Sequence, residues 1–336
     1  MTSIMTNASA MTALKTLSAT NAALSTTQSR ISTGYRVAEA SDNAAYWSIA
    51  TTMRSDNKAL ATVKDALGLG AAKVDTAYTG MKSAIDVVDE IKTKLVAARE
   101  PGVDKTKIQA EITQLQGQLI SNAGAASFSG ENWLSIDSSA AGYSTTKSIV
   151  ASFTRSASGS VSVGTISINT ANMALFDAGA DVNATPDGTG ILDAKYTSTT
   201  GAVGSYVAAG TVTTDQSTAT GLQVFTVTTL SISALTNGAD DLATLEGFIK
   251  GVDDAISKMT TAASDLGAAK KRIDLQSNFV SNLMDTIERG VGTLVDADMN
   301  KESTRLQALQ VQQQLGIQAL SIANSNSQSV LSLFRG

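Results

Sequence analysis

Residues 245–294 read LEGFIKGVDDAISKMTTAASDLGAAKKRIDLQSNFVSNLMDTIERGVGTL. An apolar residue recurs at every seventh position, namely at Leu245, Val252, Met259, Leu266, Ile273, Val280, Ile287 and Leu294. The residues three places after them are mostly apolar too, and Gln276 and Gly290 interrupt that second row. Spacings of three and four place side chains on one side of an α-helix, and a repeat of seven is typical of coiled coils. The stretch therefore predicts one long helix with a single buried face.

A matching repeat lies in the first half of the chain. Its apolar positions, again seven apart, are Met53, Leu60, Leu67, Val74, Met81, Val88 and Leu95. The row three places later is apolar except at Asp56 and Gly70. Two such repeats in one chain predict two long helices that pack along a shared seam.

A third, shorter helix is expected after Pro101 and Gly102, which end the first repeat. Asp104 can cap its start, because a carboxylate accepts the unpaired amide protons of a first helical turn. The apolar residues that follow lie on one helical face, at Ile108, Ile112, Leu115 and Leu119. We expect a mainly α fold, in which residues 35–137 and 239–299 form an antiparallel helical bundle.

Residues 138–238 have a different composition, dominated by serine, threonine, glycine and alanine. Short alternating apolar runs occur there, such as Val161, Val163, Ile166 and Ile168, and turn signals such as Pro186-Asp187-Gly188 separate them. This pattern predicts a small β-rich domain inserted between the helices. A flexible low-complexity linker is the alternative interpretation.

The two ends of the chain are nearly free of charge. Residues 1–34 contain only Lys15 and Arg30 as charged residues, and residues 306–334 contain none. A solvated helix displays a charged face, so we expect residues 1–34 and 300–336 to form terminal helices buried against other protein. A membrane-active helix is the alternative, but it would carry a polar face rich in lysine and arginine. The residues expected in the protein interface are Ile4, Met11, Leu14, Leu24, Arg30, Ile31, Leu306, Leu309, Gln313, Leu320, Asn324, Val330 and Phe334.

The composition argues against most other functional classes. The chain contains no histidine and no cysteine, so the usual general bases, thiolate nucleophiles and transition-metal ligands are missing. We expect no enzyme activity, no cofactor and no metal. A net charge of −5 offers no basic surface for nucleic acid. No secretory signal peptide and no apolar run long enough for a membrane span are apparent, and these features alone predict a soluble cytoplasmic protein.

Two motifs near the ends of the chain resemble bacterial flagellins. Residues 28–37 (QSRISTGYRV) and 40–45 (ASDNAA) resemble the N-terminal flagellin signature. Residues 306–310 (LQALQ), 323–325 (ANS) and 330–335 (VLSLFR) are similar to the C-terminal flagellin helix. The segments YWSIA at 46–50 and FSGENWL at 128–134 further resemble flagellins of the rhizobial, alphaproteobacterial branch.

This resemblance implies a structural subunit that polymerises into an extracellular flagellar filament for swimming. It implies an inner tube of paired terminal helices, an outer tube of heptad helices and an exposed insert. It also implies export by the flagellar type III apparatus without a cleaved signal peptide, which replaces the cytoplasmic expectation. The implied partners are copies of the chain or paralogous flagellins, an export chaperone, and the hook-associated and cap proteins. A hook–filament junction protein and a secreted coiled-coil adhesin or translocator are the alternatives.

Overall fold

The computed structural model describes residues 7–178, 190–194, 196–199, 206–207 and 222–333. The chain divides into two compact units, one formed by Met1–Ala59 with Asn282–Gly336 and the other by Leu60–Ser281. The three-part division expected from the sequence is finer than this and stays a prediction.

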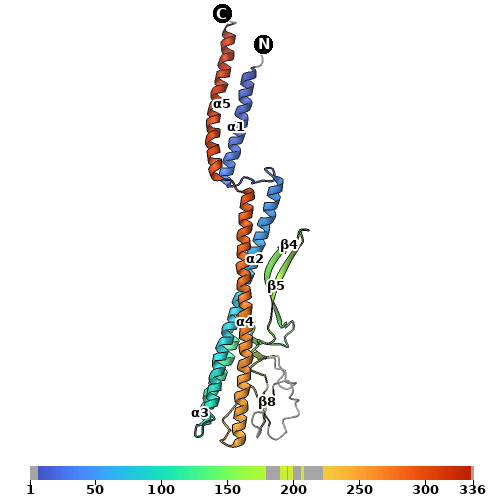
Figure 1. The fold of residues 1–336 in the computed structure, drawn as a ribbon, viewed down its shortest axis with the longest axis vertical. Coiled ribbons are helices and arrows are strands. Elements are labelled where there is room, and N and C mark those ends of the chain that lie inside the picture. The colour runs from blue at the N-terminus through green and yellow to red at the C-terminus, as the bar shows by residue number, and fades with distance from the viewer. Residues whose placement is uncertain (1–6, 179–189, 195, 200–205, 208–221, 334–336) are drawn as a thin grey trace. The chain divides into compact units, whose positions relative to one another are not determined.

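Five helices account for most of the described residues, so the mainly α fold is confirmed. They are α1 (Ala8–Thr33), α2 (Ala44–Ala97), α3 (Lys105–Ala125), α4 (Ala239–Val295) and α5 (Met299–Leu333) (Figure 1). The two heptad repeats lie in α2 and α4, as the spacing predicts.

The local sequence explains where several helices begin and end. Asn7 caps α1 by accepting the amide proton of Ala10, and Gly34 ends that helix at a φ of 75°, which glycine adopts without strain. The Asp104 side chain accepts from the amides of Thr106 and Lys107, so the predicted cap of α3 is confirmed. Asp240 and Asp241 in the first turn of α4 complement the positive end of the helix dipole.

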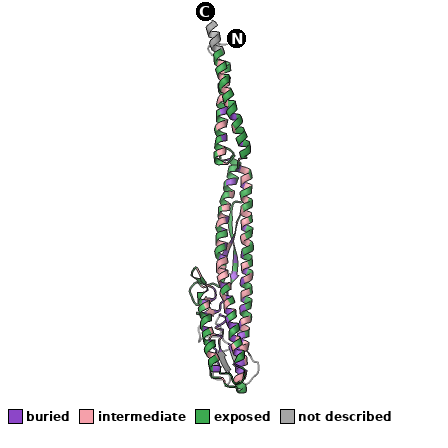
Figure 2. Ribbon diagram, turned by 90° about the vertical axis from the view of Figure 1, so that its left-hand side faces the viewer, coloured by how far each residue is buried: buried purple, intermediate pink, exposed green. Residues whose placement is uncertain are grey.

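The core of the unit Leu60–Ser281 is the seam between α2 and α4. Every seventh residue of the two repeats in this unit has at most 3% of its surface exposed, as the buried stripe in Figure 2 illustrates. Lys92 Nζ lies 2.5 Å from Asp253 Oδ1, and Lys64 Nζ donates to Ser281 Oγ at 3.2 Å, so the helices run antiparallel. The buried seam residues are Leu60, Leu67, Val74, Met81, Val88, Leu95, Leu245, Val252, Met259, Leu266, Ile273 and Val280.

Two interruptions of the heptad pattern face one another across this seam and are covered by a β-hairpin. Strands β4 (Thr146–Arg155) and β5 (Val161–Asn169) pair antiparallel, with a register shift between Val150 and Ser152. A Cβ atom at Gly70 would lie 2.5 Å from Ile149 Cγ2, and Gln276 Nε2 donates to the carbonyl of Ala151 at 2.9 Å. The absence of a side chain at Gly70 therefore makes room for Ile149.

The other described strands are short. Strand β1 (Ser127–Phe128) pairs antiparallel with β2 (Glu131–Asn132), and β3 (Ser135–Ile136) pairs parallel with β6 (Phe176–Asp177). Strands β7 (Tyr196–Thr199), β8 (Tyr206–Val207) and β9 (Leu222–Phe225) form a sheet in the order β8-β7-β9.

Aromatic packing joins this sheet to α4. The ring centroids of Tyr196 and Phe225 lie 5.7 Å apart, and those of Phe225 and Phe248 lie 4.5 Å apart. Gly251 on α4 leaves space for them, because a Cβ there would lie 2.7 Å from the Phe225 ring. The small strand-containing insert predicted from the sequence is therefore present, and its described strands pack on the helices instead of forming a linker.

Replacing Gly70 tests how the β4–β5 hairpin packs on α2. Gly70→Val should lower the free energy of unfolding by about 1–3 kcal/mol relative to Gly68→Val, because the new side chain overlaps Ile149. Gly68 is the matched control, since it lies in the same helix and a Cβ there meets nothing within 4 Å. Urea denaturation followed by circular dichroism measures both. Equal stability of the two variants would show that packing of the β4–β5 hairpin does not depend on the missing side chain at Gly70.

Candidate assembly surface on the terminal helices

Helices α1 and α5 lie side by side and antiparallel (Figure 1). The Asn7 side-chain amide donates to the carbonyl of Ala323 at 3.0 Å, and Gln313 Nε2 donates to Asn21 Oδ1 at 2.8 Å. At the other end of the pair, Arg30 Nη1 lies 3.3 Å from Glu302 Oε1. These contacts set one register along the whole pair.

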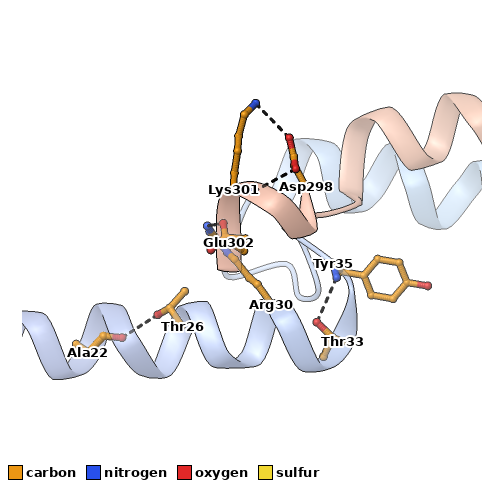
Figure 3. Close-up of polar contacts among 8 residues, drawn as sticks. All are labelled: Ala22, Thr26, Arg30, Thr33, Tyr35, Asp298, Lys301 and Glu302. Carbon is orange, nitrogen blue, oxygen red and sulfur yellow. Dashed lines mark hydrogen bonds and ion pairs between the residues drawn. The ribbon is translucent and has the colours of Figure 1, made fainter. Parts of the chain in front are cut away.

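The Arg30–Glu302 ion pair is the most buried charged contact between α1 and α5 (Figure 3). Glu302 is 8% exposed, and a buried carboxylate is tolerated only when it is paired. Arg30 Nε and Glu302 Oε2 have no hydrogen-bond partner, so the pair is only half satisfied. Sequence reasoning selected Arg30 but missed Glu302, although one of only two charges in α1 signals an opposite charge nearby.

The turn from α4 into α5 is held by backbone and carboxylate hydrogen bonds (Figure 3). Asp298 Oδ1 accepts from the amides of Asn300 and Lys301 at 3.1 and 3.2 Å. These bonds and the Lys301 ammonium favour the charged form, so the pKa of Asp298 lies below its ordinary value of 3.8. The amide of Ala297 donates to the carbonyl of Gly34 at 2.8 Å, which joins the start of α5 to the end of α1.

Over residues 8–33 and 299–325, where the structure describes the side chains, the helix pair buries almost no apolar side chains. Its buried residues are Thr20 and Thr27 on α1 and Glu302 and Leu309 on α5. Large apolar side chains are instead exposed along the pair, and Figure 2 shows how much of both helices is exposed. They are Met11, Leu14, Met299, Val311, Leu315, Ile317 and Ile322, each 46–64% exposed. An apolar surface of this extent marks an interaction site.

The threonines of α1 make this surface more apolar than the sequence suggests. The hydroxyls of Thr12, Thr16 and Thr20 each donate to the carbonyl four residues earlier, at 2.8–2.9 Å. Thr26 does the same to Ala22, as Figure 3 shows. Because the helix itself satisfies these hydroxyls, they need no partner from outside.

The residues expected in the interface are distributed over the pair as follows. Leu309 is buried between the helices, whereas Met11, Leu14 and Asn324 are exposed. Ile4, Phe334 and the side chain of Val330 lie outside the described residues. Intermediate burial is found for Leu24, Arg30, Ile31, Leu306, Gln313 and Leu320. The interface list expected from the sequence omits Val311, Leu315, Ile317 and Ile322, although their hydrophobicity in an uncharged stretch of helix was a signal.

The unit formed by Met1–Ala59 with Asn282–Gly336 also has a small core beside the helix pair. Val37, Ala50, Val291 and Val295 are buried there. The expected seam residues Met53, Ile287 and Leu294 pack against this cluster and are only partly buried.

Metal and membrane sites find no support in the described part of the chain. No group of three or more acidic residues there could hold a metal ion. None of the described helices combines the length and hydropathy that crossing a membrane requires.

Comparison with known proteins decides the family. Residues 4–139 match the model of the bacterial flagellin N-terminal helical region, and residues 249–334 match that of the C-terminal helical region. The chain is 55% identical to Flagellin C of Rhizobium meliloti strain 1021 and 51% identical to Flagellin A of Rhizobium meliloti. It is 46% identical to a flagellin of Brucella melitensis biotype 1. Each alignment covers 100% of both chains.

The chain belongs to the flagellin family. This flagellin is a structural subunit of the bacterial flagellar filament, an extracellular assembly, and its relatives are of the rhizobial, alphaproteobacterial type. The cytoplasmic location predicted by composition alone is therefore wrong, because the flagellar filament is extracellular. The exposed apolar pair α1–α5 is the feature of this flagellin that best fits a polymer contact.

Acid should lower the free energy of unfolding of this flagellin, partly because the carboxylates that cap a loop and a helix become protonated. Asp42 Oδ2 accepts from the amides of Glu39 and Ala38, and these bonds lower the pKa of Asp42. Backbone hydrogen bonds of the same kind lower the pKa of Asp298. A lowered carboxyl pKa contributes stability that is present above the unfolded value of 3.8 and lost as pH falls through the folded value. The double variant Asp42→Asn, Asp298→Asn should therefore be less stable than the native chain at pH 7.

The measurement is thermal unfolding over a pH series, on monomers for Asp42→Asn alone and on filaments for the double variant, because the Asp298 cap requires an ordered α5. The difference between variant and native chain should close only as pH falls below 3.8 and through the lowered folded pKa values, where both carboxylates become protonated. A difference that stays constant over the series would mean that the charge of the caps contributes nothing.

Proposed function

We propose that polymerisation of this flagellin is driven by α1 and α5, which bury their exposed apolar faces against the same helices of neighbouring copies. The observation that carries the proposal is an imbalance in the described part of the pair, where seven large apolar side chains are exposed and Leu309 is the one apolar side chain that is buried. Fully burying one such side chain stabilises an assembly by about 1.5–3 kcal/mol. The residues of this interface are those predicted from the sequence, together with Val311, Leu315, Ile317 and Ile322.

The polar residues of α5 suit a contact with protein better than one with lipid. The helix carries many glutamines and asparagines between its apolar residues, and no charge follows Arg305 before residue 335. Side-chain amides both donate and accept, so they can pair across a protein interface, whereas lipid leaves them unpaired. The Gln313–Asn21 bond within the pair is one such contact.

The low stability of the isolated α1–α5 pair fits export before assembly. Two helices that bury so little cannot fold stably alone, because isolated helices are marginal in water. The ends are therefore unfolded in the monomer and become ordered when copies stack. This state suits passage through the flagellar type III apparatus with a chaperone, without a cleaved signal peptide, and later contact with the hook-associated and cap proteins.

These properties suggest a role for each part of the chain. Residues 1–34 with 300–336 form the inner core of the filament, and residues 35–137 with 239–299 form a surrounding layer. The α2–α4 seam stiffens that layer and transmits torque, while residues 138–238 face the medium. The chain acts as a structural protein without catalysis, since it offers neither histidine nor cysteine.

Removing the second terminal helix should abolish assembly. A chain that lacks residues 306–336 loses Val311, Leu315, Ile317 and Ile322, and should remain a soluble monomer. Sedimentation after incubation under assembly conditions checks this, and circular dichroism shows that α2 and α4 stay helical. Normal sedimentable polymers from the truncated chain would refute the proposal.

A single charge on α5 should have a similar effect. Leu320→Asp would bury an unpaired carboxylate in the interface, which costs several kcal/mol, so filaments should be lost. Val161→Asp is the control, because Val161 lies on β5 and is 49% exposed. Electron microscopy of both variants should show filaments only for Val161→Asp. Filaments of normal length from Leu320→Asp would place that residue outside the interface.

A further inference from the structure

The start of α2 presents an apolar surface that has no partner helix. Tyr46 is 41% exposed, Trp47 38% and Ile49 49%. Asn43 fixes the first turn, because its carbonyl accepts from the amide of Trp47 at 2.9 Å and its side chain accepts from that of Tyr46 at 3.1 Å. Three large side chains are thus held exposed on an ordered helical turn.

The reason for their exposure is the point at which α4 ends. In this unit Met53 approaches Gly290, with 3.8 Å between Met53 Cε and a Cβ placed there. If the antiparallel register is continued from this contact, Tyr46 falls level with residue 297 and Trp47 with residue 296. Helix α4 ends at Val295, so the first turn of α2 extends past it.

The heptad phase accounts for Ile49. Tyr46 and Ile49 continue the two apolar rows of α2, seven residues before Met53 and Asp56. The buried residue of this segment is instead Ala50, which packs with Val291 and Val295. At this point of α2 the buried side of the helix therefore carries Ala50, which is 2% exposed, and not Ile49, which is 49% exposed. The side of α2 that carries Ile49 therefore has apolar residues at heptad positions that stay exposed.

Composition indicates what covers this surface. Residues 43–53 contain no charged residue, in contrast to the rest of α2, and in this they resemble the uncharged stretch 306–334 and the nearly uncharged α1 of the same unit. Tyrosine and tryptophan are enriched in protein–protein contacts, because they bury a large apolar area and still offer a polar group. The absence of lysine and arginine disfavours an anionic lipid surface. In a filament, the protein beside each subunit is another subunit.

We propose that Tyr46, Trp47 and Ile49 form a subunit–subunit contact of the filament that is separate from the α1–α5 surface, and that its occupant is a second copy of this chain. An open helical polymer requires head-to-tail contacts between different surfaces of the same molecule. This surface supplies one of them. The inference rests on the proposed function only in that the chain polymerises.

Tryptophan fluorescence tests the proposal directly. The chain has two tryptophans, and Trp133 is 3% exposed whereas Trp47 is 38% exposed. In Trp133→Phe the emission comes from Trp47 alone. Its acrylamide quenching constant should fall by about threefold or more from monomers to filaments, because the centre of an interface excludes water. The samples are filaments sheared from cells with this chain as sole flagellin, and monomers obtained from them.

A quenching constant that is equal in monomers and filaments would overturn the proposal. If Trp133→Phe fails to fold, the native chain gives the same information, since Trp133 is shielded from acrylamide in both states. The quenchable fraction of its emission should then fall on assembly, and an unchanged fraction would overturn the proposal equally.

Cysteine substitution gives a second measurement with a matched control. The chain contains no cysteine, so Ile49→Cys and Thr51→Cys each introduce a single thiol on the same helix. Both positions are exposed, but they lie about 160° apart around the helix. Alkylation at position 49 should slow about tenfold or more on assembly, and by more than at position 51. Equal slowing at the two positions, or none at position 49, would overturn the proposal.

Failure of this inference is distinguishable from failure of the proposed function. An accessible Trp47 in intact filaments overturns the contact at the start of α2 and leaves the role of α1 and α5 untouched. Polymers formed without residues 306–336 would overturn that role, whether or not Trp47 is protected.

Discussion

The terminal helices expose more apolar surface than they can bury against each other, and this constraint links the fold of the chain to its assembly. In the part of the α1–α5 pair whose side chains are described, Leu309 is the buried apolar residue, while side chains such as Leu14 and Leu315 remain exposed. The pair is held in register by polar contacts, above all Arg30 with Glu302. Polar contacts of this kind select one alignment but contribute little net stability. A subunit built in this way is completed only by its neighbours, which is the property that a filament requires.

The α2–α4 seam has the opposite character, because it is closed within the chain. In the unit Leu60–Ser281 both heptad rows bury their apolar residues, and ion pairs such as Lys92–Asp253 flank the seam. Those exposed pairs are worth less than about 1 kcal/mol each, so the buried side chains carry the stability. Its interruptions have a structural use, since Gly70 and Gln276 receive the β4–β5 hairpin. One chain thus combines a self-sufficient bundle with ends that depend on other copies.

Burial at the start of α2 lies between these two cases. Its apolar rows continue into Tyr46 and Ile49. Helix α4 has ended at the level of Tyr46, and the buried side of α2 carries Ala50 instead of Ile49, so these two residues stay exposed. The uncharged segment 43–53 matches the ends of the chain in composition and the heptad helices in pattern. An open seam beside an assembly surface explains why aromatic residues occur at an exposed position of a filament subunit.

The sequence by itself determined the helices, the buried rows of α2 and α4, the Asp104 cap and the unusual terminal segments, because periodicity, capping and charge are local properties. The resemblance of both ends to flagellins extended this to the filament. Only the tertiary structure decided that Gly70 lies level with Gln276, that Glu302 pairs with Arg30, and that Tyr46 and Trp47 extend past Val295. Each of these depends on the register between segments more than 200 residues apart in the chain. Register is set by the sum of many weak contacts along the helices, and no short stretch of sequence contains it.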